Sequence, residues 1–126
     1  MKTITQTYII NAPIEKVWDA LVNPQTIDQW GGGPAIMDDQ VGTKFSLWGG
    51  DIFGTNTKVE PFKTLEQDWY GGKWEKASKV IITLSEDNGC TKVDLIHQDY
   101  PENSKDDFAD GWKTYYFGPL KDLVEN

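Results

Sequence analysis

The sequence has 126 residues with 6 Trp, 5 Tyr and 5 Phe, and its 20 acidic against 12 basic residues give a net charge of −8. Every basic residue is Lys, which argues against nucleic acid and anionic membrane partners, because phosphate recognition favours clustered cations and Arg. No stretch of about 18 apolar residues could span a membrane, and the first ten residues do not resemble a signal peptide. The length suits one domain, residues 1–126, and the lone Cys90 fits a reducing compartment, so we expect a cytoplasmic protein.

The first quarter of the chain predicts one strand and two short helices. Thr3–Ile10 alternates polar and apolar residues, as a half-buried strand does. Pro13 suits the first turn of a helix, and the next apolar residues follow at helical spacing: Ile14, Val17, Trp18 and Leu21. Asn23 and Pro24 end this helix and begin a second one over Pro24–Trp30, which Gly31-Gly32-Gly33-Pro34 terminates.

The middle of the chain predicts strands separated by turns. Asn88-Gly89 is a tight-turn signal, so the last two strands are expected to form an antiparallel hairpin. The candidate strands are Lys44–Trp48, Ile52–Glu60, Thr64–Trp69, Ser78–Leu84 and Thr91–Gln98.

A long helix is predicted at the C-terminal end. Ser104 can cap it, and Asp106 and Asp107 favour the positive end of the helix dipole. Pro119 lies inside the helix and is expected to kink it, because proline removes a backbone hydrogen bond. The apolar stripe comprises Phe108, Trp112, Tyr115 or Tyr116, Leu120 and Leu123. The order of elements predicts an α+β fold, with one antiparallel sheet and the helix on one of its faces.

Strand alternation also predicts which side chains face the helix. Most are apolar: Phe45, Leu47, Phe53, Val59, Leu65, Trp69, Val80, Ile82, Leu84, Val93 and Leu95. Polar residues fall on the same face: Thr55, Thr57, Gln67, Thr91 and His97. An unpaired buried polar group costs about 1–3 kcal/mol, so these side chains either pair with one another or surround a cavity that holds water or a ligand.

Several of these segments carry a family resemblance that extends along essentially the whole chain. The resemblance begins with Ile10–Leu21, followed by Pro24 and Trp30. Further motifs carry it along the chain: Gly42-x-x-Phe45, Gly54 leading to Pro61 and Leu65, Trp69, Val80-x-Ile82-x-Leu84, Thr91-x-Val93-x-Leu95-x-His97, and Gly111-Trp112 ahead of Leu120. Together they resemble the START-like (SRPBCC, helix-grip) superfamily, and more narrowly the family of the C-terminal domain of the Hsp90 ATPase activator. The resemblance implies a curved antiparallel sheet that grips a long C-terminal helix, with a cavity between them.

The resemblance leaves function open. In the family that the chain resembles, the eukaryotic activator joins such a domain to a separate N-terminal domain that grips the chaperone. This chain is too short to include that second domain. The resemblance also implies that single-domain relatives are mostly of unknown function or similar to binders of small hydrophobic molecules. We therefore carry over the fold and the cavity, and not chaperone activation.

The aromatic residues are the main candidate site. Phe53, Trp69, Trp112 and Tyr115 are expected inside, with Trp30, Trp48 and Trp74 near the rim. They either form a core or line a pocket, in which Thr57, Gln67 and His97 would orient a ligand.

His97 is the only histidine and the candidate for an acid–base group, with Asp99 two residues away. Its more usual role would be a satisfied inward side chain or a polar contact for a ligand. No metal or cofactor is expected, because His97 has no second ligand on its strand face.

Three hypotheses follow from the sequence. The first is a non-enzymatic intracellular binding module for a small apolar or aromatic molecule, held by Phe53, Thr57, Gln67, Trp69, His97, Trp112 and Tyr115. The second is a cavity enzyme, similar to cyclases, dehydratases or hydrolases, that uses His97 or Tyr115. The third is a chaperone-associated or other protein-interaction role, in which the acidic chain binds a basic partner. The sequence does not determine the oligomeric state.

Overall fold

The fold is built on one six-stranded sheet, described by a computed structural model over residues 2–71, 74–100 and 108–126. All neighbouring strands are antiparallel, in the order β1-β6-β5-β4-β3-β2. The strands are β1 (Lys2–Ile10), β2 (Lys44–Leu47), β3 (Ile52–Glu60), β4 (Thr64–Gly71), β5 (Ser78–Asp87) and β6 (Cys90–Tyr100). The α+β prediction and the order of the elements are confirmed.

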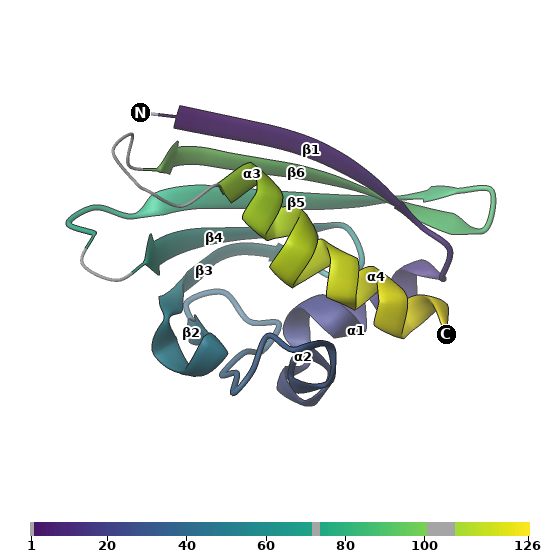
Figure 1. The fold of residues 1–126 in the computed structure, drawn as a ribbon, viewed down its shortest axis with the longest axis horizontal. Coiled ribbons are helices and arrows are strands. Elements are labelled where there is room, and N and C mark those ends of the chain that lie inside the picture. The colour runs from purple at the N-terminus through teal and green to yellow at the C-terminus, as the bar shows by residue number, and fades with distance from the viewer. Residues whose placement is uncertain (1, 72–73, 101–107) are drawn as a thin grey trace.

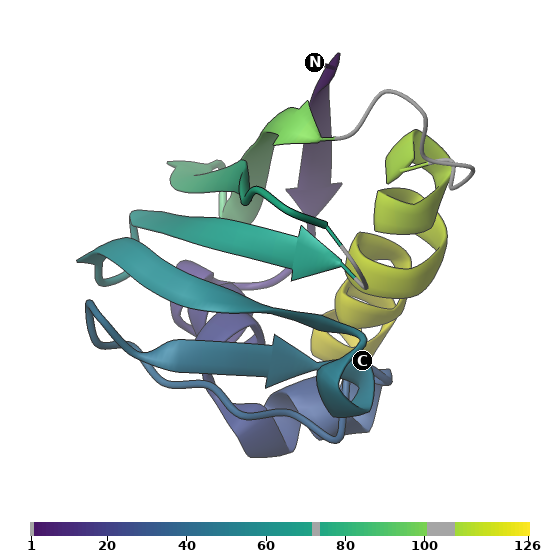
Figure 2. The same ribbon diagram turned by 90° about the vertical axis from the view of Figure 1, so that its left-hand side faces the viewer.

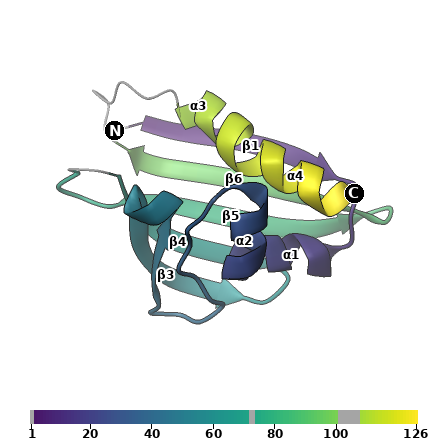
Figure 3. The same cartoon turned by 60° about the horizontal axis from the view of Figure 1, so that its bottom comes forward.

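The helices lie on one face of the sheet. The C-terminal helical segment runs diagonally across that face (Figure 1). The helices α1 (Ile14–Val22) and α2 (Pro24–Trp30) lie next to its C-terminal part, α4 (Figure 3), and α1 also contacts β5 and β6. Viewed from the side, the curved sheet and the C-terminal helix form two layers, and no described helix covers the outer face of the sheet (Figure 2). None of the helices in the described ranges is long and apolar enough to cross a membrane.

Local sequence signals explain the turns and helix ends. The Asn23 side chain accepts a hydrogen bond from the Gln25 backbone N–H at 3.0 Å and so caps α2. Gly31, with φ of 101°, ends the same helix in the left-handed region. Asn88 and Gly89 both have positive φ, 53° and 82°, which is the backbone shape of a two-residue hairpin turn between β5 and β6.

The C-terminal segment changes its helical type along its length. It begins as α3 (Phe108–Gly111), continues as a π-helix (Trp112–Phe117) and ends as α4 (Gly118–Glu125). The Gly118 N–H donates to the Lys113 carbonyl, five residues back, and a Cβ on Gly118 would lie only 2.4 Å from that oxygen. A π-helical segment thus lies just before Pro119, where the sequence predicted a kink. The predicted start at Ser104, Asp106 and Asp107 lies outside the described residues.

The core lies between the sheet and the helices. Its largest fully buried apolar side chains come from every layer: Ile10, Leu21, Ile27, Phe45, Leu47, Leu65, Ile82, Leu95, Phe117 and Leu120. Burying each such side chain contributes about 1.5–3 kcal/mol. The inward assignment is confirmed for the apolar residues of β2, β4, β5 and β6.

Candidate functional site

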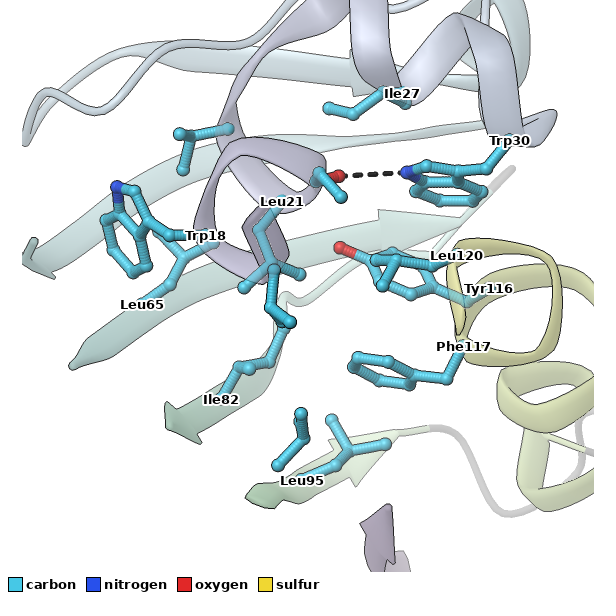
Figure 4. Close-up of a cluster of buried hydrophobic side chains, with 14 of the residues drawn as sticks. Trp18, Leu21, Ile27, Trp30, Leu65, Ile82, Leu95, Tyr116, Phe117 and Leu120 are labelled. Carbon is cyan, nitrogen blue, oxygen red and sulfur yellow. Dashed lines mark hydrogen bonds between the residues drawn. The ribbon is translucent and has the colours of Figure 1, made fainter. Parts of the chain in front are cut away.

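The inner face of the sheet and the C-terminal helix meet in a cluster of aromatic rings, here called the interior cluster: Trp30, Trp48, Trp69, Trp112, Tyr116 and Phe117. Trp69 of β4 stacks on Trp112 of the helix, with ring centroids 4.6 Å apart. The ring centroid of Tyr116 lies 4.8 Å from those of both Trp30 and Trp112. Figure 4 shows Trp30, Tyr116 and Phe117 converging. The interior cluster therefore consists of rings that contact one another across four elements: α2, the short 3₁₀ turn at Trp48, β4 and the π-helix.

The three tryptophans predicted near the rim, Trp30, Trp48 and Trp74, differ in how deeply they are buried. Trp30 is buried, and its Nε1–H donates to the Ala20 carbonyl at 2.8 Å (Figure 4), so it belongs to the core. Trp48 is half-buried and its ring centroid lies 6.3 Å from that of Tyr116. Trp74 is half-buried beside Gly71, where a Cβ would approach its ring to 3.2 Å.

His97 is fully buried between the sheet and the helix. The Trp112 Nε1–H donates to His97 Nδ1 at 3.1 Å, and Ser78 Oγ lies 2.8 Å from His97 Nε2. Indole nitrogen is only a donor, so Nδ1 must accept and the proton of the neutral ring must be on Nε2. His97 therefore donates to Ser78, whose hydroxyl donates onward to the Trp69 carbonyl at 3.1 Å.

This arrangement has the opposite polarity to a nucleophilic Ser–His pair. In such a pair the histidine accepts the serine proton at one nitrogen and donates from the other to a carboxylate. Here the second nitrogen accepts from an indole N–H, and Asp99, the expected orienting group, is exposed at a positive φ of 63°. Burial lowers the pKa of His97 to about 4, so the ring is neutral at neutral pH.

A second polar chain leads from the interior cluster to the loop before β2. The Trp69 Nε1–H donates to Gln67 Oε1 at 2.8 Å, and Gln67 Nε2 donates to Asn56 Oδ1 at 2.9 Å. The Asn56 amide in turn donates to the carbonyls of Asp38 at 3.1 Å and Gln40 at 3.2 Å. The buried amides Asn56 and Gln67 are thus paired internally, which fixes the backbone of residues 38–40.

The Tyr116 hydroxyl is the exception among these buried polar groups. It is the one buried side-chain oxygen or nitrogen of the described residues without a hydrogen-bond partner. Burial raises the pKa of Tyr116, so the hydroxyl keeps its proton. In Figure 4 the hydroxyl points from the C-terminal helix toward α1.

Four of the seven predicted ligand-contact residues lie together in this interior: Gln67, Trp69, His97 and Trp112. The inward prediction for Phe53, Thr55 and Thr57 is wrong, because the residues of β3 buried inside are Gly54 and Asn56. Thr57 is the extra residue of an irregularity between Asn56, opposite Gln67, and Lys58, opposite Glu66. A bulge reverses the alternation, so Val59 packs inward as predicted and Phe53 points outward.

Tyr115 is also misplaced by the prediction. It is 65% exposed, whereas the next residue, Tyr116, is buried. In an α-helix residues i+3 and i+4 both lie near residue i, but π-helical bonding from i to i+5 widens the turn. Tyr116 and Phe117 consequently take the positions above Trp112. The predicted site omitted four interior residues, Asn56, Ser78, Tyr116 and Phe117. The bulge and the π-helix leave no clear sequence signal.

The outer face of the sheet carries a second aromatic group. Phe53 stacks on Tyr70 with ring centroids 5.4 Å apart and an angle of 8° between the ring planes.

Among the described residues, no group of three His, Cys, Asp or Glu side chains could hold a metal ion.

Residues 11–125 match the family model described as "Activator of Hsp90 ATPase homolog 1-like protein". The chain is 30% identical, over 82% of its length, to an "Activator of 90 kDa heat shock protein ATPase homolog" from Dictyostelium discoideum, of which it spans only 28%. It also spans about a third, 35%, of the human homolog 1, with 23% identity.

Two solved structures share the fold along nearly the whole chain. One is described as PFC0360w, an Hsp90 activator from Plasmodium falciparum, with a TM-score of 0.86, 23% identity, and coverage of 98% of this chain and 96% of that one. The other is the Aha1 dimer from Colwellia psychrerythraea, with a TM-score of 0.78, 23% identity, and coverage of 99% and 95%.

Proposed function

Because the chain belongs to the family of Activator of Hsp90 ATPase homolog 1-like proteins, we propose that it is a protein-interaction module that associates with a chaperone of the Hsp90 class. The solved chain of the P. falciparum protein described as an Hsp90 activator has nearly the same extent as this chain, which supports a role for the domain on its own. We place this association in the cytoplasm.

The observation that carries the proposal is how the interior is occupied. Trp69 and Trp112 stack on each other, and the polar side chains of Gln67 and His97 bond to groups of the same chain. A pocket for a small molecule normally presents polar groups that await a ligand. Since these groups already have partners, the surface is the better candidate for recognition.

The net charge of the chain indicates the charge of the partner's contact surface. A net charge of −8 favours a basic contact surface, because electrostatic complementarity speeds association and suppresses wrong partners. Such association weakens as salt rises, since the screening length shortens to about 10 Å at 0.1 M ionic strength.

The test is direct binding of the purified chain to the Hsp90-class chaperone of the same organism. Calorimetry or sedimentation at 25 mM and 300 mM salt should give saturable binding that weakens at the higher salt. An unrelated acidic protein of similar size is the matched control. Absence of binding at low salt, with or without nucleotide on the chaperone, would contradict the proposal.

A second candidate rests on the Tyr116 hydroxyl. Among the described residues this hydroxyl is the one buried donor without a protein partner, and a small apolar ligand with a single acceptor would satisfy it. The test is a thermal-shift and Trp-fluorescence screen with fatty acids, sterols and flat aromatic compounds, with Tyr116→Phe as the matched variant. A saturable shift that the Phe variant loses supports this candidate, and no shift in the wild type removes it.

We propose no catalytic role for His97. Both ring nitrogens already have hydrogen-bond partners, and its pKa of about 4 makes it a poor base or acid near neutral pH. Unchanged turnover in His97→Gln, should a reaction of this protein be identified, is the expected result.

A further inference from the structure

One cross-strand row on the outer face of the sheet is unusually apolar. Tyr70 lies opposite Phe53, Phe53 opposite Ser46, and Ser46 opposite Ile36 in an isolated bridge. Residues directly opposite each other in antiparallel strands share a face. Ile36, Ser46, Phe53 and Tyr70 therefore form one row, called here the outer row. At a strand spacing of about 4.8 Å, it spans about 14 Å.

The outer row has two exposed apolar residues, Phe53 and Ile36, beside the half-buried Ser46 and Tyr70, and it differs from the neighbouring row. Phe53 is 40% exposed and Ile36 is 64% exposed, and no described helix covers this face (Figure 2). The adjacent row on the same face is polar, with the paired residues Lys44, Thr55, Asp68, Lys79, Gln98 and Thr3. Contiguous exposed apolar side chains rimmed by polar ones are typical of protein contact sites.

The outer row is also rigid. The backbones of Ile36 and Ser46 exchange two hydrogen bonds of 2.9 and 3.0 Å, and the Phe53–Tyr70 stack restrains both rings. Just beyond Ile36, the buried Asn56 amide holds the backbone of residues 38–40. A preorganised apolar surface loses little conformational entropy on binding, which favours affinity.

Charge around the outer row selects the partner. The segments that carry it, residues 36–46, 51–55 and 68–70, contain four Asp and one Lys. They are Asp38, Asp39, Asp51, Asp68 and Lys44. A second copy of this chain would bring the same acidic excess against it, whereas a basic surface complements it.

We propose that the outer row is the docking surface for the chaperone, which would contact it with an apolar side chain flanked by Lys or Arg. This inference rests on the proposed function and adds to it the face of the molecule that is used. It also assigns a role to Phe53 and Tyr70, which the interior does not use.

The experiment compares two double variants in the chaperone-binding assay. The row variant, Phe53→Ser with Ile36→Ser, removes the two exposed apolar side chains of the outer row. The control, Phe62→Ser with Ile9→Ser, removes two exposed apolar residues elsewhere, which are 47% and 48% exposed. The row variant should bind at least tenfold more weakly, as losses at the centre of an interface do, and the control should stay within about twofold. Thermal unfolding and far-ultraviolet circular dichroism check that both variants remain folded.

A third variant tests the charge. Asp39→Asn with Asp51→Asn neutralises two exposed carboxylates beside the outer row and should flatten the salt dependence of binding. An unchanged salt dependence would contradict the basic partner surface.

The outcomes separate the two proposals. If the wild type binds and the row variant binds equally well, the outer row is not the docking surface and the proposed function stands. If the wild type does not bind the chaperone at all, the proposed function fails and the docking surface fails with it. If the wild type self-associates in sedimentation and only the row variant loses this, a second copy is the occupant and the inference is wrong.

Discussion

The interior cluster and the outer row use the same kinds of residue for opposite purposes. Trp69 and Tyr70 are consecutive in β4 and point to opposite faces of the sheet, Trp69 against Trp112 and Tyr70 against the exposed Phe53. Inside, ring nitrogens find acceptors on the same chain, and the rings close on one another. Outside, Phe53 of the stacked pair stays exposed, and Tyr70 is half-buried. An aromatic-rich composition therefore does not by itself indicate a binding pocket. Of the two regions, the outer row says more about where a partner would bind.

The largest expected difference between the regions is in stability. Trp112→Ala should lower the free energy of unfolding by about 3–5 kcal/mol, because it leaves a cavity and removes the donor to His97. Phe53→Ala should cost about 1 kcal/mol, since only an exposed ring stack is lost. Urea unfolding of both variants measures this, and similar losses would contradict the division into an interior cluster and an outer row.

The next effect is a pH dependence that only the interior should show. The pKa of His97 is lowered by burial to about 4, against 6.5 for an exposed histidine. Between these values the unfolded chain binds the proton and the folded chain does not. Stability is therefore fully present above pH 6.5 and falls as the pH drops toward 4, by about 3 kcal/mol in total.

The His97 effect can be followed by urea unfolding at a series of pH values, with His97→Gln as the control for carboxylate titration. The wild type should lose more stability than the control between pH 6.5 and 5. His97 is the only histidine in the chain, so its ring signals in the NMR spectrum report the pKa without overlap. A folded-state value near 6.5 would contradict the neutral ring that accepts from Trp112.

The smallest effect has the opposite sign. Tyr116→Phe removes a buried hydroxyl that has no hydrogen-bond partner among the described residues. The variant should be as stable as the wild type or more stable by about 1 kcal/mol, because no bond is lost and no polar group is buried. A loss of more than 1 kcal/mol in chemical unfolding would show that the hydroxyl has a partner, such as a bound small molecule.

The sequence predicts most of the fold because its local signals agree with the final packing. Pro24–Trp30 and Ile52–Glu60 have the predicted boundaries, and the Asn88-Gly89 hairpin forms as expected. In β4, β5 and β6 the alternation is regular, so Gln67, Trp69 and His97 were placed on the correct face.

The misplaced site residues have a common physical cause. Each prediction assumed a fixed period, two for a strand and 3.6 for a helix. The bulge at Thr57 and the π-helix at Trp112–Phe117 each change that period locally, and this moved Phe53 and Thr57 outward and exchanged Tyr115 for Tyr116. Such local changes of period depend on tertiary packing and not on the residue pattern alone.

The most direct test of recognition by the outer surface is a ¹⁵N NMR spectrum of the chain, recorded with and without the chaperone. Backbone signals of Ile36, Ser46, Phe53 and Tyr70 should shift or broaden first, at substoichiometric chaperone. The indole signals of Trp69 and Trp112, which donate hydrogen bonds inside the protein, should be the last to change. Early changes at these indoles, with the outer row unaffected, would contradict this account and return recognition to the interior.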